Sequence, residues 1–192
     1  VPAQRGQGKS TGFNTGLSAG STGGAVYGTT LRGTTGLGTT RMISDSGTVP
    51  HVCGFMDLNL DFGFLTRFGS GATQDMVMKG SNHTFINVTF IAFTAVGNPT
   101  VDITPNSTFD FGKHKFRGCD FYDAGTASTY TFNLDGSITD CYFEGTAASF
   151  SQLLQINSGR LVNCYFASNK AYSNAIVQVA PPANSNSPEM VV

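Results

Sequence analysis

The stretch Ile138-Thr139-Asp140-Cys141-Tyr142-Phe143 decides the fold, because three other segments repeat its pattern. Each copy reads apolar residue, variable residue, turn-forming residue, Val or Cys, polar residue or Tyr, and finally Phe. By subtraction, Cys119 to Cys141 is 22 residues and Cys141 to Cys164 is 23. A period of this length is typical of folds that stack one unit on the next. The other copies are Phe85-Ile86-Asn87-Val88-Thr89-Phe90, Phe116-Arg117-Gly118-Cys119-Asp120-Phe121 and Leu161-Val162-Asn163-Cys164-Tyr165-Phe166.

A second apolar pair follows each copy, thirteen and fifteen residues after its Val or Cys. Residues two apart share one face of a strand, so each pair predicts a further inward-facing strand in every repeat. Val88 lies 31 residues before Cys119, so the first interval contains an insertion. The pairs are Val101 and Ile103, Phe132 and Leu134, Leu154 and Ile156, and Val177 and Val179.

The third residue of each copy predicts a sharp corner. Asn, Asp and Gly tolerate the left-handed backbone region, and a corner lets the apolar residues on both sides of it point into one core. Equivalent side chains on rungs about 4.8 Å apart then stack on one another. The predicted corners are Asn87, Gly118, Asp140 and Asn163, and the predicted stacks are Phe90, Phe121, Phe143 and Phe166, and Val88, Cys119, Cys141 and Cys164.

The pattern resembles the right-handed parallel β-helix of pectate-lyase-like proteins, a group that includes bacteriophage tailspikes and other virion appendages. The resemblance covers residues 54–180. It implies an all-β, right-handed parallel β-helix of about four to five coils. It indicates a fold and no particular chemistry.

The chain divides near residue 50. Residues 1–50 hold 12 Gly, 10 Thr and 5 Ser, with isolated apolar residues between them. Alone, such a segment cannot bury enough surface to offset its ordering entropy. We expect an extended, Gly/Thr/Ser-rich N-terminal assembly arm, with a passive linker as the alternative. The β-helix domain follows over residues 51–180, and a Pro/Ser-rich tail over residues 181–192.

Alternating apolar residues predict one half-buried strand at the start of the β-helix. This strand could cover the N-terminal end of the stack. A short β-helix otherwise leaves unpaired strand edges at both ends, which favours association. The residues on the inward face are Met56, Leu58, Leu60, Phe62 and Phe64.

Composition excludes several functions. The chain has 192 residues, a formal charge of −1 and only 12% charged residues, which argues against nucleic-acid binding. Residues 3–10 fit a loose phosphate-loop pattern, but no strand precedes them and no helix is expected after them. No continuous apolar run is long enough for a membrane-spanning helix. No metal or other cofactor is expected, since no His lies at a ligand spacing from any Cys.

The cysteine stack predicts inert thiols packed in a dry core rather than redox groups. Free thiols favour folding in a reducing compartment, such as the bacterial cytoplasm in which virions assemble. No outward acid lies one coil from another acid in the register that glycoside hydrolysis needs, so no catalytic residues are predicted. The outward acids are expected to be Asp102, Asp120, Asp123, Asp135, Asp140 and Glu144.

Two exposed features are candidate ligand or interface sites. The insertion before the second coil carries the basic residues Lys113, His114, Lys115 and Arg117, which suit an acidic neighbour, an anionic glycan or a solvated loop. Tyr142 and Tyr165 take the outward slot between Cys and Phe, one coil apart. They suit a subunit interface, which we favour, or a sugar platform.

These features predict a non-catalytic structural protein of a virus particle, in particular a phage. The arm would anchor it, and the β-helix would decorate or reinforce the capsid or tail exterior. The expected partners are other virion proteins and further copies of the chain, in a homo-oligomer such as a trimer, with no nucleic acid and no membrane. Its place is the virion, assembled in the host cytoplasm. The alternative is a tailspike-like domain that binds or depolymerises host polysaccharide.

Overall fold

The computed structural model describes residues 4–5, 29–32, 41–45, 52–62, 76–80, 82–92, 101–104, 113–123, 130–145, 152–168 and 176–180. Within these residues every regular element is a β-strand, and fourteen strands form one sheet. All the strand pairs are parallel. The strands are β1 (Gln4–Arg5), β2 (Thr30–Arg32), β3 (Ile43–Asp45), β4 (Gly54–Asp61), β5 (Met76–Met78), β6 (Thr84–Ala92), β7 (Val101–Ile103), β8 (Lys115–Arg117), β9 (Asp120–Asp123), β10 (Tyr130–Thr139), β11 (Tyr142–Gly145), β12 (Gln152–Val162), β13 (Tyr165–Ser168) and β14 (Val177–Val179).

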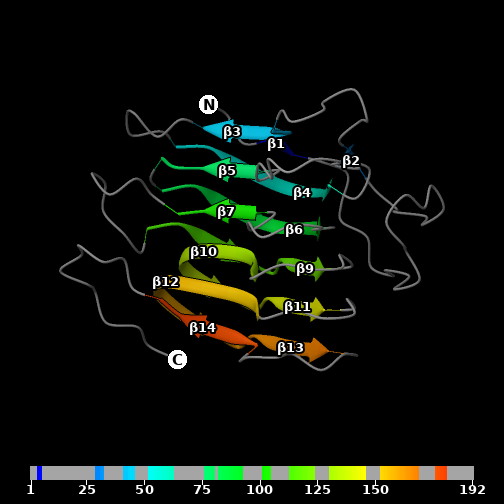
Figure 1. Ribbon diagram of the computed structural model, residues 1–192. Helices are drawn as coiled ribbons and strands as arrows, with labels where there is room; N and C mark the ends of the chain where they lie inside the picture. Colours follow the sequence, from blue (N-terminus) through cyan, green and yellow to red (C-terminus); the bar gives the residue numbers. More distant parts are fainter. Residues whose placement is uncertain are drawn as a thin grey trace, which may run out of the picture.

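The strands stack in three ladders, and the chain passes through them in a fixed order. Ladder 1 contains β1, the starts of β4 and β6, β8, and the ends of β10 and β12. Ladder 2 contains β2, the ends of β4 and β6, β9, β11 and β13. Ladder 3 contains β3, β5, β7, the starts of β10 and β12, and β14. We call one passage through the three ladders a coil; the stacked coils, visible in Figure 1, are consistent with a parallel β-helix.

In the coils whose passage from ladder 1 to ladder 2 is described, the chain turns at a single left-handed residue, which we call the corner. The four predicted corners are confirmed, with φ angles between 50° and 60°. A fifth corner occurs at Asp57, with φ 52°. Polar side chains stack along this edge, since the Nδ2 of Asn87 donates to Oδ1 of Asp57 at 2.7 Å, and Asn163 donates to Asp140 at the same distance.

The second strand of each repeat is also confirmed. Phe132 pairs with Val101 on one side and with Leu154 on the other, and Leu154 pairs with Val177. Met76 extends the same row by pairing with Val101. The fixed offset in the sequence therefore corresponds to one ladder of the structure.

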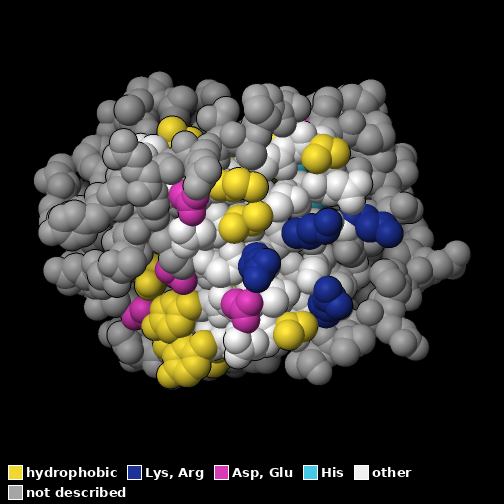
Figure 2. Space-filling view, turned by 180° about the vertical axis from the view of Figure 1, so that it is seen from behind, with side chains coloured by type: hydrophobic (Ala, Val, Ile, Leu, Met, Phe, Trp, Pro, Cys, Tyr) yellow, Lys and Arg dark blue, Asp and Glu magenta, His cyan; other side chains and the backbone are white. Residues whose placement is uncertain are grey.

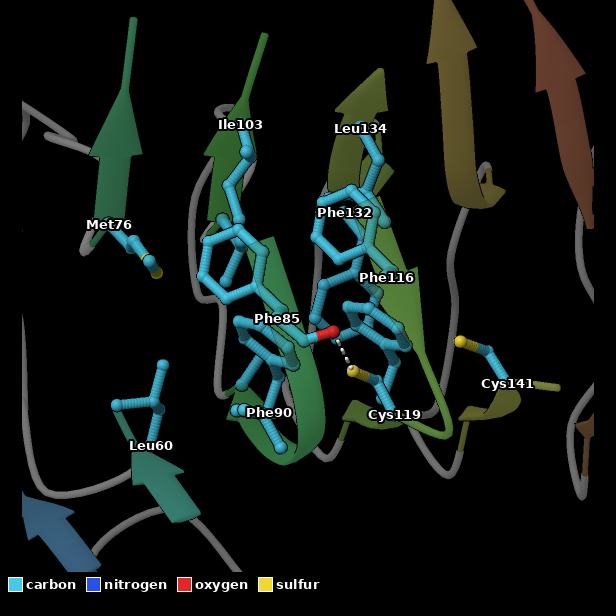
Figure 3. Close-up of a cluster of buried hydrophobic side chains, with 14 of the residues drawn as sticks. Leu60, Met76, Phe85, Phe90, Ile103, Phe116, Cys119, Phe132, Leu134 and Cys141 are labelled. Carbon is cyan, nitrogen blue, oxygen red and sulfur yellow. Dashed lines mark hydrogen bonds between the residues drawn. The ribbon is translucent and has the colours of Figure 1, made fainter. Parts of the chain in front are cut away.

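The core consists of rows of like side chains. The phenylalanines of ladder 2 stack with ring centroids 4.5–4.8 Å apart, as predicted. A second row stacks Phe55, Phe85 and Phe116 in ladder 1, at 5.6 and 5.0 Å. Figure 3 shows both rows meeting inside the coils, beside Cys119 and Cys141. Burying each large apolar side chain contributes about 1.5–3 kcal/mol, so the rows stabilise the stack coil by coil.

The predicted strand at the start of the β-helix is confirmed as β4, with Leu58, Leu60 and Phe62 buried, but its unbroken alternation over residues 56–64 is wrong. The corner at Asp57 divides it, so that Met56 is half-buried on ladder 1 while Phe55 enters the core. Residues 55–60 are a further copy of the repeat, with Leu60 in the place of the final Phe and paired with Phe90. The strand does not cover the end of the stack either, because β1 and β2 pair with it on the side away from β6. Phe64 lies outside the described residues.

Parts of the predicted arm belong to the same sheet. β1, β2 and β3 add one strand to each of the three ladders, by pairing with β4 and β5. The rest of residues 1–50 and the predicted tail over residues 181–192 lie outside the described residues. The role of the N-terminal segment in assembly stays a prediction.

Candidate functional site

The two predicted tyrosines stack on the outer face of ladder 2. Tyr142 and Tyr165 pair in register, and their rings are 5.6 Å apart and nearly parallel. Tyr165 is 64% exposed, whereas Tyr142 is partly buried. Since β11 and β13 have adjacent positions in a regular ladder, their backbone holds both rings in place, and the pair forms a flat aromatic surface.

Two further side chains belong to this surface: Tyr122, which the sequence reasoning missed, and Glu144, which it named only as an outward acid. The hydroxyl of Tyr142 donates to Oε2 of Glu144 at 2.9 Å, and the ring of Tyr122 lies 5.8 Å from that of Tyr142. Tyr122 pairs with Glu144 across the ladder. Tyr122 lies two residues after Asp120, and Glu144 lies two residues after Tyr142. Since residues two apart share one face of a strand, this spacing could have placed both beside the predicted tyrosines. We call Tyr122, Tyr142, Glu144 and Tyr165 the tyrosine face.

The hydroxyls of Tyr122 and Tyr142 remain protonated in the neutral range. Burial, followed by the hydrogen bond to Glu144, raises the pKa of Tyr142 to about 12. Burial and the charges of Asp120 and Glu144 raise the pKa of Tyr122 above its ordinary value. The tyrosine face therefore offers hydroxyl donors and aromatic carbons beside carboxylates.

The basic cluster is divided between the surface and the interior. Lys113, Lys115 and Arg117 are exposed, while Phe116 points into the core. His114 is 1% exposed, so the expectation that it is available to a ligand is wrong. Alternation along β8 and the residues before it explains the division. Arg160, from the end of β12, joins the three exposed cations on ladder 1.

His114 belongs to a buried row at the bend between ladder 3 and ladder 1. Its ring stacks on that of His83 at 5.0 Å, and its Nδ1 accepts from the backbone N–H of His83 at 3.2 Å. Burial, together with the smaller effects of His83 and Lys79, lowers the pKa of His114 to about 3. His114 is therefore a neutral structural group.

Cys53 and Asp45 lie on either side of His83. Nδ1 of His83 is 3.2 Å from both the Sγ and the backbone N of Cys53, and Nε2 is 3.2 Å from Oδ2 of Asp45. This order of thiol, imidazole and carboxylate is also found in nucleophilic sites. Here burial and the charge of Asp45 raise the pKa of Cys53 to about 11, which disfavours the thiolate that a nucleophile needs.

The other cysteines form the predicted inward stack. All four thiols in the chain are free. Cys119 is buried and its Sγ donates to the carbonyl of Phe85 at 3.5 Å. A hydrogen bond from the neighbouring thiol and burial raise the pKa of both Cys141 and Cys164. These thiols pack as small core groups.

Three of the acids expected on the outside are instead buried in hydrogen-bonded positions. Oδ2 of Asp102 accepts from Nζ of Lys79 at 2.7 Å. Asp123 accepts a hydrogen bond from Thr131, and Asp135 accepts one from Ser158. The reasons differ from acid to acid. Asp123 continues the inward alternation of Phe121 along β9, and Asp135 lies at the register shift of β10. Asp102 alternates with the core residues Val101 and Ile103 in β7 and is buried with its hydrogen-bond partners.

The remaining acids lie closer to the surface. Asp140 is exposed at its corner and Asp120 is partly exposed on ladder 2, whereas Glu144 is buried beneath the tyrosine face, with only 9% exposure. Figure 2 shows acidic, aromatic and basic side chains on one side of the molecule. Among the described residues, no group of three or more His, Cys, Asp or Glu side chains is arranged to hold a metal ion.

No protein-family model, curated protein or solved structure matches the chain. The fold is therefore supported by the repeat and by the three parallel ladders themselves. The described part of the chain contains no helix with the length and apolarity needed to cross a membrane.

Proposed function

We propose that the chain is a right-handed parallel β-helix of the pectate-lyase-like kind and a non-catalytic structural component of a virus particle, in particular a phage. It decorates or reinforces the exterior of the capsid or tail after assembly in the host cytoplasm. Its partners are other virion proteins and further copies of itself, and a trimer is the first oligomer to test.

The observation that carries this proposal is the exposed stack of Tyr142 and Tyr165. Large aromatic side chains with a polar tip are favoured at protein interfaces, because they bury much area and lose little conformational freedom. The pair sits on a regular ladder, so it is rigid before a partner arrives. The conformational entropy that such a surface loses on binding a partner is therefore small.

The buried acids also favour a structural role. Asp102, Asp123 and Asp135 are engaged with Lys79, Thr131 and Ser158, and these contacts connect coils or close turns. A glycosidase uses two carboxyl groups that face one substrate from opposite sides. Carboxylates that are buried and already hydrogen-bonded are unsuited to that task.

The test is whether purified particles of the encoding virus contain the chain, and whether the tyrosine face is needed there. Particles are produced with the natural chain, with Tyr142→Ser/Tyr165→Ser, and with Val179→Ser. Val179 is another exposed apolar residue of the last coil, but it lies on ladder 3, so it provides a matched control. Mass spectrometry of the particles should find the natural chain and the control at equal amounts, with the double variant at least about tenfold depleted. Absence of the natural chain from particles contradicts the proposal.

Self-association is measured separately by light scattering of the full chain. A mass that is a multiple of 20.2 kDa supports a homo-oligomer, and a trimer has three times that mass. Loss of the oligomer in the double tyrosine variant, but not in Val179→Ser, assigns the contact to the tyrosine face. A monomer at every concentration removes the homo-oligomer from the proposal.

A tailspike-like domain that binds or depolymerises host polysaccharide is the second candidate. The observation that favours it is the hydrogen bond of Tyr142 to Glu144, with Tyr122 and the carboxylate of Asp120 nearby. Aromatic rings beside carboxylates suit a sugar, whose apolar face stacks and whose hydroxyls donate. Binding of host glycans that is lost in Tyr142→Ser supports this candidate, and release of reducing sugar supports cleavage.

A further inference from the structure

Four cations are exposed on the outer face of ladder 1. Lys115 and Arg117 come from β8, Arg160 comes from the end of β12, and Lys113 lies just before β8. Figure 2 shows basic side chains gathered on this side of the molecule. The chain as a whole has a net charge of −1, so the positive charge of this face is local.

The backbone register fixes the spacing of these charges. Lys115, Ser137 and Arg160 pair in sequence along one row of ladder 1, so two rungs, or about 9.6 Å, separate the two cations. Arg117 lies in the neighbouring row, paired with Thr139. Nε of Arg160 donates to the hydroxyl of Ser137 at 3.0 Å, which orients its guanidinium along the row.

The cations of this face have no acidic partner among the described residues. The ion pairs found there join Lys79 to Asp102 and His83 to Asp45, away from this face. Asp120, three residues after Arg117, is partly exposed on ladder 2, and the exposed Asp140 lies at the corner after Thr139, where its Oδ1 accepts from Asn163. Like charges held on one rung, as in Lys115 and Arg117, or two rungs apart, as in Lys115 and Arg160, repel one another, and a bound anion relieves that repulsion.

The rest of the face indicates what kind of anion fits. The outward partners of the cations are the hydroxyl residues Thr84, Ser137 and Thr139 and the apolar residue Ile86, and Val162 pairs with Thr139 in the next coil. No aromatic residue is among these outward positions of ladder 1, and single-stranded nucleic acids are usually held by stacking on aromatic rings. Hydroxyls interleaved with Arg and Lys instead suit a chain of sugars that carries carboxylate or sulfate groups.

We propose that the outer face of ladder 1, formed by Lys113, Lys115, Arg117 and Arg160, binds a linear anionic polysaccharide. The guanidinium groups take the carboxylate or sulfate groups, while Ser137 and Thr139 hydrogen-bond sugar hydroxyls. This inference does not rest on the assembly role of the tyrosine face, which lies on a different ladder.

Affinity measurements on the full chain test the proposal. Heparin is the sulfated probe, hyaluronan is the carboxylated probe, and neutral dextran is the control polymer. The variant Arg117→Ser/Arg160→Ser removes one cation from each row of the face. Arg41→Ser removes an exposed cation before β3, on ladder 3, and is the matched control. Circular dichroism and the Tm establish that each variant is folded.

We expect both anionic polymers to bind at about 0.1 M salt, with binding that weakens as salt rises, and dextran not to bind. The double variant should bind heparin at least about tenfold more weakly, while Arg41→Ser stays within about twofold. Three results overturn the proposal: no retention of either polyanion, an equal loss in Arg41→Ser, or tighter binding of single-stranded DNA than of heparin. A change of solution mass in the double variant with unchanged heparin affinity also overturns it, since the face is then a contact between copies.

Discussion

Ladder 1 is connected to ladder 2 by the corner and to ladder 3 by the bend. Both turns change the direction of the chain, but the corner has room for a side chain at its glycine and the bend has none. At the corner to ladder 2, a Cβ added to Gly118 meets nothing within 4 Å. At the bend from ladder 3, a Cβ added to Gly136 lies 2.2 Å from the carbonyl oxygen of His114, and one on Gly159 lies 2.0 Å from that of Gly136. Both turns contain positive φ angles. The neighbouring coil, and not the backbone angle alone, decides which turn requires glycine.

The two edges of the molecule consequently have different chemistry. The corner edge is open, so Asp and Asn side chains stack along it in hydrogen-bonded pairs. The bend edge is closed. Its first three positions hold Cys53, His83 and His114, whose side chains face inward, and its last two hold glycine. Substitutions at the bend and at the corner should therefore change the stability of the protein by different amounts.

The largest expected effect is that of Gly136→Ala. Its Cβ collides with backbone of the preceding coil, and φ 110° is strained for any L side chain. Strain and overpacking together predict a loss of about 4 kcal/mol in the free energy of unfolding. Urea unfolding followed by circular dichroism measures the loss. A loss below that of Gly118→Ala contradicts the comparison.

The second largest effect is a decrease in the free energy of unfolding at acid pH, caused by the buried His114 at the bend. Burial lowers the pKa of His114 from 6.5 to about 3, so between these values the unfolded chain binds a proton that the folded chain does not. Stability from this group is complete above pH 6.5 and decreases as pH falls. The slope is about 1.4 kcal/mol per pH unit, which gives about 3 kcal/mol between pH 6.5 and pH 4.

The variant His114→Asn isolates this contribution. Asn offers an oxygen to the N–H of His83 and does not titrate. Its free energy of unfolding should therefore fall less steeply between pH 6.5 and pH 4 than that of the natural chain, whatever its stability at pH 7. Equal slopes in the two proteins contradict the assignment to His114.

At the corner the expected effect is smaller. Gly118→Ala should cost about 1 kcal/mol, because the left-handed region is unfavourable for Ala although space is free around its Cβ. The same unfolding measurement applies. A loss as large as that of Gly136→Ala shows that the corner is also closed.

The smallest effect has the opposite sign. Gly118→Asn places a side chain between Asn87 and Asp140, in a backbone region that Asn tolerates. The new amide continues the stack of polar side chains, so we expect stability about 0.5 kcal/mol above that of the natural chain. A variant no more stable than Gly118→Ala contradicts a continuous hydrogen-bonded edge.

The sequence predicted those parts of the fold that repeat without change. The pattern around Cys141 and Phe143 recurs at a constant spacing. That spacing was enough to predict the corners, the stacks of like side chains and the strands of ladder 3. The first copy was missed because Leu60 replaces Phe and because Leu58 and Leu60 also fit a simple alternation. A corner and an alternating strand differ there by one backbone angle at Asp57, which composition does not reveal.

The candidate site was predicted only where alternation holds. Tyr142, Tyr165, Lys115 and Arg117 lie on regular strands, and their outward direction followed from parity. His114 was misjudged although the same period of two buries it between exposed Lys113 and Lys115, because residues 113–117 were treated as one basic cluster. Asp123 and Asp135 turn inward at the end of a strand and at a bulge, and the partners that hold them are set by contacts between segments.

The most direct test of the stacked coils is a pair of engineered cysteines at Asp57 and Asn87. Their side chains are hydrogen-bonded at 2.7 Å although 30 residues separate them, and that contact follows from the register of coils. Under mild oxidation, Asp57→Cys/Asn87→Cys should form a disulfide that peptide mass mapping assigns to these two positions. Asp57→Cys/Asn163→Cys, separated by four rungs or about 19 Å, should remain reduced. A reduced first pair, or equal bridging in the second, contradicts the stacked arrangement.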